Sequence, residues 1–192
     1  MMTDIKNAKD ARAEPRQWDI AADWWRDMQD RRANGEPNPR ADRAARARLR
    51  RADGAMAVAD PAVLTLYRAL GGRGWNEARM KVALRLAQVL VHAREDDRAA
   101  SFARSLGPKN FDEKDCVLSP LRMRALLQAD GEEDLVRRFR RAVDLLNARV
   151  NVRDLARLLI LWDQEQTRTR FAFDYFDAGA AAPVAAAQDI SA

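Results

Sequence analysis

The segment Val136–Leu146, VRRFRRAVDLL, places four arginines within five consecutive positions around one phenylalanine. On a helix that turns about 100° per residue, Leu135, Phe139 and Val143 fall in one sector, and the arginines spread over the opposite side. This separation of apolar from charged side chains is typical of a helix that packs one face against a core. The segment therefore predicts an amphipathic helix.

The composition of the whole chain points to helices throughout. The 192 residues are 47% hydrophobic, enough for a sizeable core, and include only 8 Gly and 7 Pro. Ala, Arg and Leu dominate and favour helices, whereas the β-branched residues that favour strands are sparse. We therefore expect an all-α protein, folded as a compact bundle of about eight helices with a basic surface.

Several helix boundaries are visible as capping signals. A capping side chain precedes a proline at Asn38-Pro39, Asp60-Pro61 and Ser119-Pro120, and each pair predicts a helix start. Asn151 and the acid three residues later resemble a capping box, which predicts one long last helix through about Tyr175. The tryptophans are expected in the core except Trp24, which lies off the apolar stripe of its helix and is expected to be exposed.

The domain organisation follows from these elements. Residues 1–15 are charged and aperiodic, so we expect a flexible N-terminus. Residues 16–176 form a single helical domain in this interpretation, with two helical lobes as the alternative. Residues 177–192 are of low complexity, so we expect a disordered tail.

Charge and cysteine content indicate the setting. The net charge is +5, the pI is about 9.9, and 29 of the 34 cationic residues are Arg. Arg suits forked contacts to phosphate, although a GC-rich genome would produce the same bias. One cysteine, Cys116, allows no intrachain disulfide, and no stretch resembles a signal peptide or a membrane span. We expect a cytoplasmic protein without membrane contact.

Three predicted helices supply candidate phosphate contacts. The acids Glu133, Asp134 and Asp144 lie four residues from arginines of the opening helix and could neutralise them. Residues 40–51 hold six arginines against one acid, so either distant acids or an external anion must neutralise them. Residues 119–129 hold two arginines and no acid, near a helix N-terminus that disfavours cations. The nucleic-acid-binding candidates are Arg43, Arg46, Arg50, Arg51, Arg122, Arg124, Arg137, Arg138, Arg140 and Arg141.

Catalytic patterns find no support in the sequence. His92 is the only histidine, and no zinc spacing, Walker A loop, GxGxxG or nucleophile elbow is present. The acids Glu95–Asp97 are expected only to solvate a turn, and Asp163 with Glu165 lacks a third ligand for a nuclease-type metal pair. We expect no enzymatic activity, no cofactor and no metal site.

The order of six segments resembles one known family. An early Trp-containing helix is followed by ARLRRAD and SFARSL, then by SPLRMRALLQAD, DLVRRFRRAVDLLN, VNVRDLARLLILW and FAFDYF. In this order the chain, over roughly residues 16–176, resembles the CasB family, the small subunit of the type I-E CRISPR surveillance complex Cascade. The family usually has an aromatic residue where this chain has Met123, a position that should pack inward.

The resemblance implies an all-helical, non-catalytic subunit with a basic face. It implies contacts with other Cascade subunits that carry the CRISPR RNA, and with a second copy of the chain. It also implies that the target and displaced DNA strands are held through backbone contacts. By this likeness the candidate strand contacts are Arg50, Arg51, Arg122, Arg124, Arg137, Arg138, Arg140 and Arg141.

Two other interpretations remain open. A helix-turn-helix regulator would use residues 119–146 as its motif, but the second, salt-paired helix is poor in Asn, Gln and Ser, the usual base-reading side chains. A helical protein-interaction module would use its arginines only for acidic protein partners.

Overall fold

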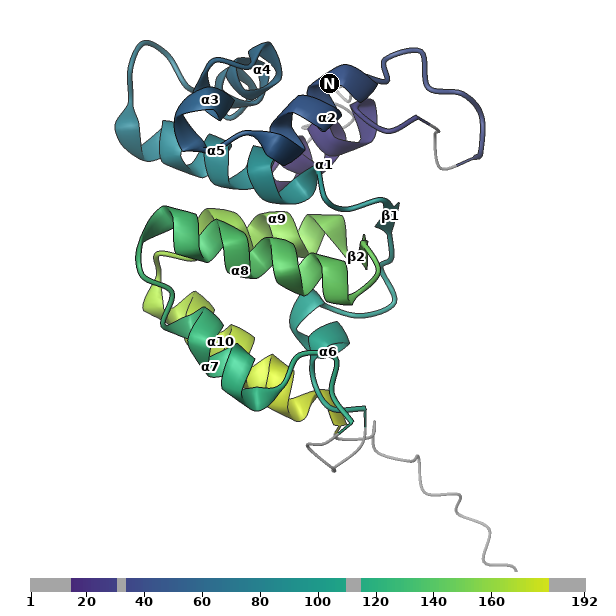
Figure 1. Ribbon diagram of the computed structural model, residues 1–192, viewed down its shortest axis with the longest axis vertical. Coiled ribbons are helices and arrows are strands. Elements are labelled where there is room, and N and C mark those ends of the chain that lie inside the picture. Colours follow the sequence, from purple (N-terminus) through teal and green to yellow (C-terminus); the bar gives the residue numbers. More distant parts are fainter. Residues whose placement is uncertain (1–14, 31–33, 110–114, 180–192) are drawn as a thin grey trace, which may run out of the picture.

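Helices make up most of the described residues, which are 15–30, 34–109 and 115–179 in the computed structural model (Figure 1). The α-helices of these ranges are α1 Gln17–Asp27, α2 Arg43–Arg51, α3 Gly54–Val58, α4 Pro61–Ala69, α5 Glu77–Leu90, α6 Phe102–Leu106, α7 Pro120–Leu127, α8 Gly131–Leu145, α9 Val152–Leu161 and α10 Glu165–Phe176. A 3-10 helix η1 (Asp177–Gly179) and two short strands, β1 (Glu95–Asp96) and β2 (Arg149–Val150), complete them. The all-α prediction is confirmed.

The helices stack in three tiers (Figure 1). The first tier holds α1 to α5, the second holds α8 and α9, and the third holds α6, α7 and α10. Helix α5 packs against α8 and α9, α1 packs against α9, and α10 packs against α6 and α7. The buried apolar residues of all three tiers belong to one hydrophobic cluster, so the tiers share a continuous core.

Three of the predicted caps are present. Asp60 accepts a hydrogen bond from the Ala62 amide, Ser119 from the Arg122 amide, and Asn151 from the Asp154 amide; each begins its helix as predicted. These bonds satisfy amide groups that a helix N-terminus leaves without an intrahelical acceptor.

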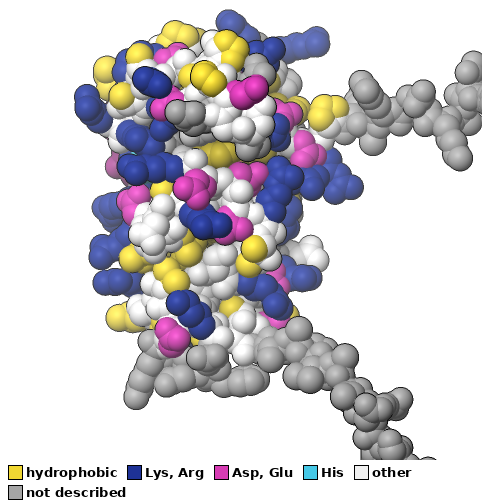
Figure 2. Space-filling model, turned by 90° about the vertical axis from the view of Figure 1, so that its right-hand side faces the viewer, with side chains coloured by type: hydrophobic (Ala, Val, Ile, Leu, Met, Phe, Trp, Pro, Cys, Tyr) yellow, Lys and Arg dark blue, Asp and Glu magenta, His cyan; other side chains and the backbone are white. Residues whose placement is uncertain are grey.

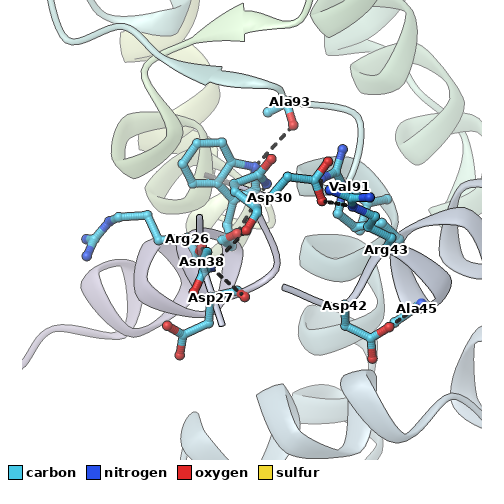
Figure 3. A network of polar contacts seen from close by, with 12 residues as sticks. Arg26, Asp27, Asp30, Asn38, Asp42, Arg43, Ala45, Val91 and Ala93 are labelled. Carbon is cyan, nitrogen blue, oxygen red and sulfur yellow. Dashed lines mark hydrogen bonds and ion pairs between the residues drawn. The ribbon is translucent and has the colours of Figure 1, made fainter. Parts of the chain in front are cut away.

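The start predicted at Asn38-Pro39 is wrong. Helix α2 begins at Arg43, and Asp42 is its cap, with a hydrogen bond of 2.8 Å from the Ala45 amide. The Asn38 side chain instead donates to the carbonyls of Arg26, Asp27 and Gln29 at the end of α1 (Figure 3). A side chain that can cap a helix start therefore closes the end of the preceding helix.

The prediction of a single long last helix is also wrong, because the chain turns between α9 and α10. Near the end of α9 the carbonyl of Leu159 accepts a hydrogen bond of 2.8 Å from Arg85 of α5. The turn brings the ring centroid of Trp162 within 4.9 Å of Phe139 and 5.3 Å of Phe171. Aromatic packing across three helices therefore outweighs the local helical periodicity. This turn, together with the short α3, raises the number of helices in the described ranges above the predicted eight.

Trp24 is buried, with 9% of its surface exposed, so its predicted exposure is wrong. Helix α1 contacts both α9 and α4, so residues beside its main apolar stripe are covered as well. The indole Nε1 of Trp24 donates to the Ala62 carbonyl at 3.1 Å. Trp75 is the exposed tryptophan, at 73%.

The acids of the turn after α5 contribute to the fold. Strand β1 pairs in parallel with β2, and Oδ1 of Asp96 accepts a hydrogen bond from the Val152 amide at 3.0 Å. The Asp97 carboxylate accepts one from Arg149, also at 3.0 Å. These acids join α5 to the start of α9 and do more than solvate a turn.

The predictions for the two chain ends lie largely outside the described residues, which exclude 1–14 and 180–192. Residues 177–179, assigned to the tail from the sequence, form η1, and Asp177 pairs with Arg104 of α6.

Candidate nucleic-acid interface

The three helices that carry the candidate arginines follow one another along one side of the molecule. Helix α2 packs against α5, α5 against α8, and α8 against α7. In Figure 1 these helices follow one another from the top of the molecule to the bottom, on the side that faces the viewer. Helices α9 and α10 lie behind α8 and α7. That side forms the left edge of Figure 2, where Lys and Arg side chains project at intervals along the height of the molecule.

Distant acids neutralise the first arginines of α2. Asp30, just after α1, accepts a hydrogen bond of 2.8 Å from Arg43 (Figure 3), and it lies 3.6 Å from Nη1 of Arg46. The side chain of Arg46 is only 14% exposed. On the other flank of α2, Arg48 pairs with the buried Asp60 at 2.8 Å. The sequence left open whether distant acids or an external anion neutralise this helix. For these three arginines, acids from elsewhere in the chain do so.

The last two arginines of α2 differ from each other. Arg50 donates through Nε to the Val91 carbonyl at 2.8 Å and is half-buried. Burial, and then the charges of Arg46 and Arg94, lower the pKa of Arg50 below its usual value. Arg51 is exposed, and its side chain has no hydrogen bond or ion pair with any described residue. Arg51 is thus free to contact an external anion.

The arginines of α8 divide in the same way. Asp134 pairs with both Arg137 and Arg138, so the predicted pairing of Asp134 with Arg138 is confirmed. Arg140 donates through Nε to the Gln88 carbonyl of α5 at 2.9 Å, and burial lowers its pKa. Arg141 is exposed and has no side-chain partner within the described ranges.

Helix α7 presents both of its arginines to solvent. Arg122 and Arg124 are exposed, and neither side chain has a partner among the described residues. Two positions along a helix correspond to about 200°, so the two side chains leave α7 on opposite flanks. Met123 between them is completely buried, as expected. A ligand lying along α8 and α7 can therefore meet only one of these two arginines directly.

A cavity of about 410 Å³ lies where α2 and the C-terminal ends of α5 and α8 meet. Its lining residues are Arg50, His92, Arg94, Asp144, Asn147 and Ala148. We call it the junction cavity. Arg94 is exposed and lines it, although its place directly after the apolar α5 carries no recognisable motif in the sequence.

His92 in this cavity is half-buried and has a lowered pKa. Burial is the main cause, and the charge of Arg140 adds to it, while Asp144 acts in the opposite direction. Nδ1 of His92 lies 3.7 Å from Oδ1 of Asp144. The lowered pKa favours the neutral imidazole, and negative charge added nearby would favour the protonated form.

Within the described ranges, no three or more His, Cys, Asp or Glu side chains lie together as a metal ion would require. None of the described helices is both long and apolar enough to cross a membrane. Asp163, one of the two acids considered for a metal pair, instead lies 3.1 Å from Nη2 of Arg85.

Comparison with known proteins gives one match. The family model described as CRISPR-associated protein Cse2 matches residues 45–176, which run from within α2 to the end of α10 and include every residue that lines the junction cavity. No curated protein and no solved structure matches the chain.

Proposed function

Because the chain belongs to the Cse2 family, also called CasB, the small subunits of the type I-E CRISPR complex Cascade, we propose that it binds nucleic-acid backbones non-catalytically within that complex. In this role it holds the target and displaced DNA strands of the R-loop during antiviral defence. Its proposed partners are the other Cascade subunits, the CRISPR RNA, both DNA strands and a second copy of the chain.

The observation that carries the proposal is a set of exposed arginines whose side chains have no partner among the described residues. Arg51 of α2, Arg141 of α8, and Arg122 and Arg124 of α7 are exposed and make no side-chain bond to a described residue. They come from helices that pack in series through α5 and α8. Guanidinium groups without counterions gain most from phosphate, since they give up no existing ion pair on binding.

The remaining candidates support the proposed interface in another way. Arg43, Arg46, Arg137 and Arg138 are paired with acids, and Arg50 and Arg140 are bound to carbonyls. Their charges add to the local positive potential, but a phosphate must compete with an existing carboxylate for each of the acid-paired ones. We propose that a strand makes its primary contacts with Arg51, Arg141 and whichever of Arg122 and Arg124 faces it, and that the acid-paired arginines contribute mainly through their field.

Such contacts read no sequence. Phosphate contacts position a protein on a strand, whereas base-edge contacts specify the sequence. In RNA-guided recognition the pairing of guide with target supplies the sequence, and exchange of strands in the R-loop is nearly balanced in free energy. A few phosphate contacts are therefore sufficient to favour the open state.

The structure gives the helix-turn-helix alternative little support. In that motif the N-terminal residues of the second helix contact base edges. The first turn of α8 instead carries the acids Glu132, Glu133 and Asp134, which would repel DNA phosphates. The interaction-module alternative is separated from nucleic-acid binding by the experiment below.

The test is the affinity for single-stranded and double-stranded DNA of unrelated sequences, measured by fluorescence anisotropy from about 50 to 200 mM salt. We expect steep salt dependence and no preference for one sequence. The double variant Arg51→Gln/Arg141→Gln should weaken binding of every sequence about equally, by about tenfold or more, because it removes two phosphate contacts.

The matched control is the double variant Arg68→Gln/Arg170→Gln, which removes the same charge from α4 and α10. Arg68 has no side-chain partner among the described residues, and Arg170 is paired with Asp174. Equal losses of DNA affinity in both double variants would show that only the net charge matters. That result would contradict the proposed interface. Binding that does not respond to salt, or that selects one duplex, would favour an alternative function.

A further inference from the structure

The junction cavity has an excess of positive charge. Arg50 of α2 and Arg94 after α5 line it, and Asp144 of α8 is the acid in its lining. The charges of two further arginines act on the lining residues: Arg46 on Arg50, and Arg140 on His92. Arg46 lies 3.6 Å from Asp30, but Arg94 and Arg140 have no ion pair with a described residue. Arginine side chains from three segments of the chain thus converge where few carboxylates balance them.

Unused hydrogen-bonding groups concentrate around the same cavity. Among the described residues, the buried side-chain atoms without a hydrogen-bond partner are Nε of Arg46, Nε2 of His92 and Nη2 of Arg140. A buried polar atom without a partner is costly, so native proteins rarely keep one. His92 lines the cavity, and the charges of Arg46 and Arg140 act on its lining residues Arg50 and His92. The unpartnered atoms of the two arginines are donors, so the positive charge around the cavity is not fully used in bonds within the described residues.

A turn with an unusual backbone forms part of the cavity lining. Asn147 and Ala148 follow α8 with φ angles of 55° and 62°, in the left-handed region that a non-glycine residue seldom adopts. The Ala148 carbonyl accepts hydrogen bonds from the Arg94 and Glu95 amides. This turn therefore positions Arg94 against the end of α8 and beside His92.

We propose that the junction cavity is a phosphate subsite, in which Arg50 and Arg94 contact the phosphate oxygens and His92 takes up a proton from solvent as the phosphate binds. The groups that face His92 are Arg50 from α2, Arg140 and Asp144 from α8, and Arg94 from its own segment. Bound phosphate adds negative charge to this set, which favours the imidazolium form, and the proton in turn strengthens phosphate binding.

The identity of the occupant as a phosphodiester of a bound strand rests on the proposed function. The ability of the cavity to bind phosphate does not rest on the proposed function, because a free phosphate offers the same oxygens to the same donors. The two sources are separated by using inorganic phosphate and an oligonucleotide without terminal phosphates as different probes.

The experiment uses His92 as its own reporter. As the only histidine in the chain, it gives unambiguous imidazole signals in the NMR spectrum of the full-length protein. Inorganic phosphate is titrated against chloride at constant ionic strength, and the pH titration of His92 is recorded with and without phosphate. We expect a saturable shift with phosphate only, and a rise in the apparent pKa of His92 by about one unit. The same response to chloride, or no saturation, would overturn the subsite.

The informative variant is Arg94→Gln. The Arg94 side chain has no hydrogen bond or ion pair with a described residue, so its replacement should leave the fold intact. Phosphate affinity read from the His92 signal should fall about tenfold or more, because a charged hydrogen-bond donor is lost. Arg68→Gln, on α4, removes the same charge elsewhere and should leave the phosphate titration unchanged. An unaltered titration in Arg94→Gln overturns the proposal.

The oligonucleotide then identifies the source. If a single strand without terminal phosphates shifts the His92 signals and competes with inorganic phosphate, the occupant is a strand phosphodiester. If the strand binds without affecting His92, the strand assignment is overturned while the subsite for free phosphate stands. If no strand binds but phosphate still does, the proposed function fails and the subsite is supported independently.

Discussion

The side chain of Arg85 is completely buried, and its Nε donates to Oε2 of Glu132 across 2.9 Å. Arg85 belongs to α5 and Glu132 to the first turn of α8, so this bond joins the first tier to the second. The same guanidinium lies 3.1 Å from Asp163 after α9 and donates to the Leu159 carbonyl. One buried cation therefore sets how α5, α8 and α9 lie against each other, and with them the arginines of the candidate interface.

The first prediction concerns this buried pair. Glu132→Ala should lower the free energy of unfolding by about 3 kcal/mol, because Arg85 remains buried with only part of its counter-charge. Chemical denaturation measures the loss. The neighbouring Glu133→Ala is the control, since Glu133 is exposed and has no partner among the described residues, and it should change stability by less than about 0.5 kcal/mol. Equal effects of the two substitutions would refute the proposed role of Arg85.

The second prediction concerns Asp60. Burial would raise its pKa, but the hydrogen bonds from Arg48 and the Ala62 amide outweigh burial and hold the pKa below the ordinary value of 3.8. A depressed carboxyl pKa contributes stability that is present above about pH 3.8 and is lost as the pH falls through the folded-state pKa. Asp60→Asn should therefore cost about 1 kcal/mol at pH 7 and progressively less below pH 4. Denaturation curves from pH 7 to 2 test this, and a difference that persists unchanged at pH 2 would contradict it.

The third prediction concerns His92, whose pKa in the folded protein is lowered from 6.5 mainly by burial. The unfolded chain then takes up the proton at a higher pH than the folded chain. The free energy of unfolding should decrease as the pH falls below 6.5, by at most about 1.4 kcal/mol per pH unit. His92→Gln should remove this part of the slope between pH 7 and 5. Identical slopes in both proteins would show that His92 titrates normally.

The fourth prediction concerns Gly107, which ends α6 against α10. A Cβ at this position would lie 2.2 Å from the Tyr175 carbonyl oxygen and 2.7 Å from Cβ of Ala178. Gly107→Ala should force α6 away from α10 and lower the free energy of unfolding by about 1–3 kcal/mol. Gly54→Ala is the matched control, because its Cβ meets nothing within 4 Å in α3, and it should be neutral or slightly stabilising. A neutral Gly107→Ala would place α6 and α10 further apart than described.

The fifth prediction separates free from engaged arginines in nucleic-acid binding. The slope of log affinity against log salt concentration is negative. Its magnitude should decrease by about 0.7 for a single strand in Arg141→Gln, because one phosphate contact is lost. Arg153→Gln, on α9, should leave the slope unchanged, since Arg153 is already paired with Asp19. Salt titrations of both variants at a constant pH provide the test. Equal slopes in the two variants would contradict the assignment of Arg141.

The sequence predicted well wherever the physics is local. The caps at Asp60, Ser119 and Asn151 depend on hydrogen bonds over two or three residues, and the inward position of Met123 depends on helical periodicity. Asn38 has the same local signal as these caps. However, its side chain reaches back nine to twelve residues to close α1, which a local reading cannot detect.

The sequence predicted which arginines could form the candidate site. It did not predict which of their guanidinium groups are available to a ligand. Arg43 and Arg51 are equivalent in the sequence, but Asp30, thirteen residues from Arg43, binds only the former. Arg140 and Arg141 are adjacent, but Arg140 reaches the Gln88 carbonyl 52 residues away. Arg94 was missed because a single arginine after an apolar helix has no pattern of its own.

The amino-acid sequence by itself determined the all-α class, most helix starts, the excess of arginine and the family, because capping, periodicity and residue order are properties of short segments. Only the tertiary structure decided which guanidinium groups remain free, and that Arg50, His92 and Arg94 meet the end of α8 around one cavity. Their partners come from segments distant in the sequence, and the packing of α2, α5 and α8 brings them together.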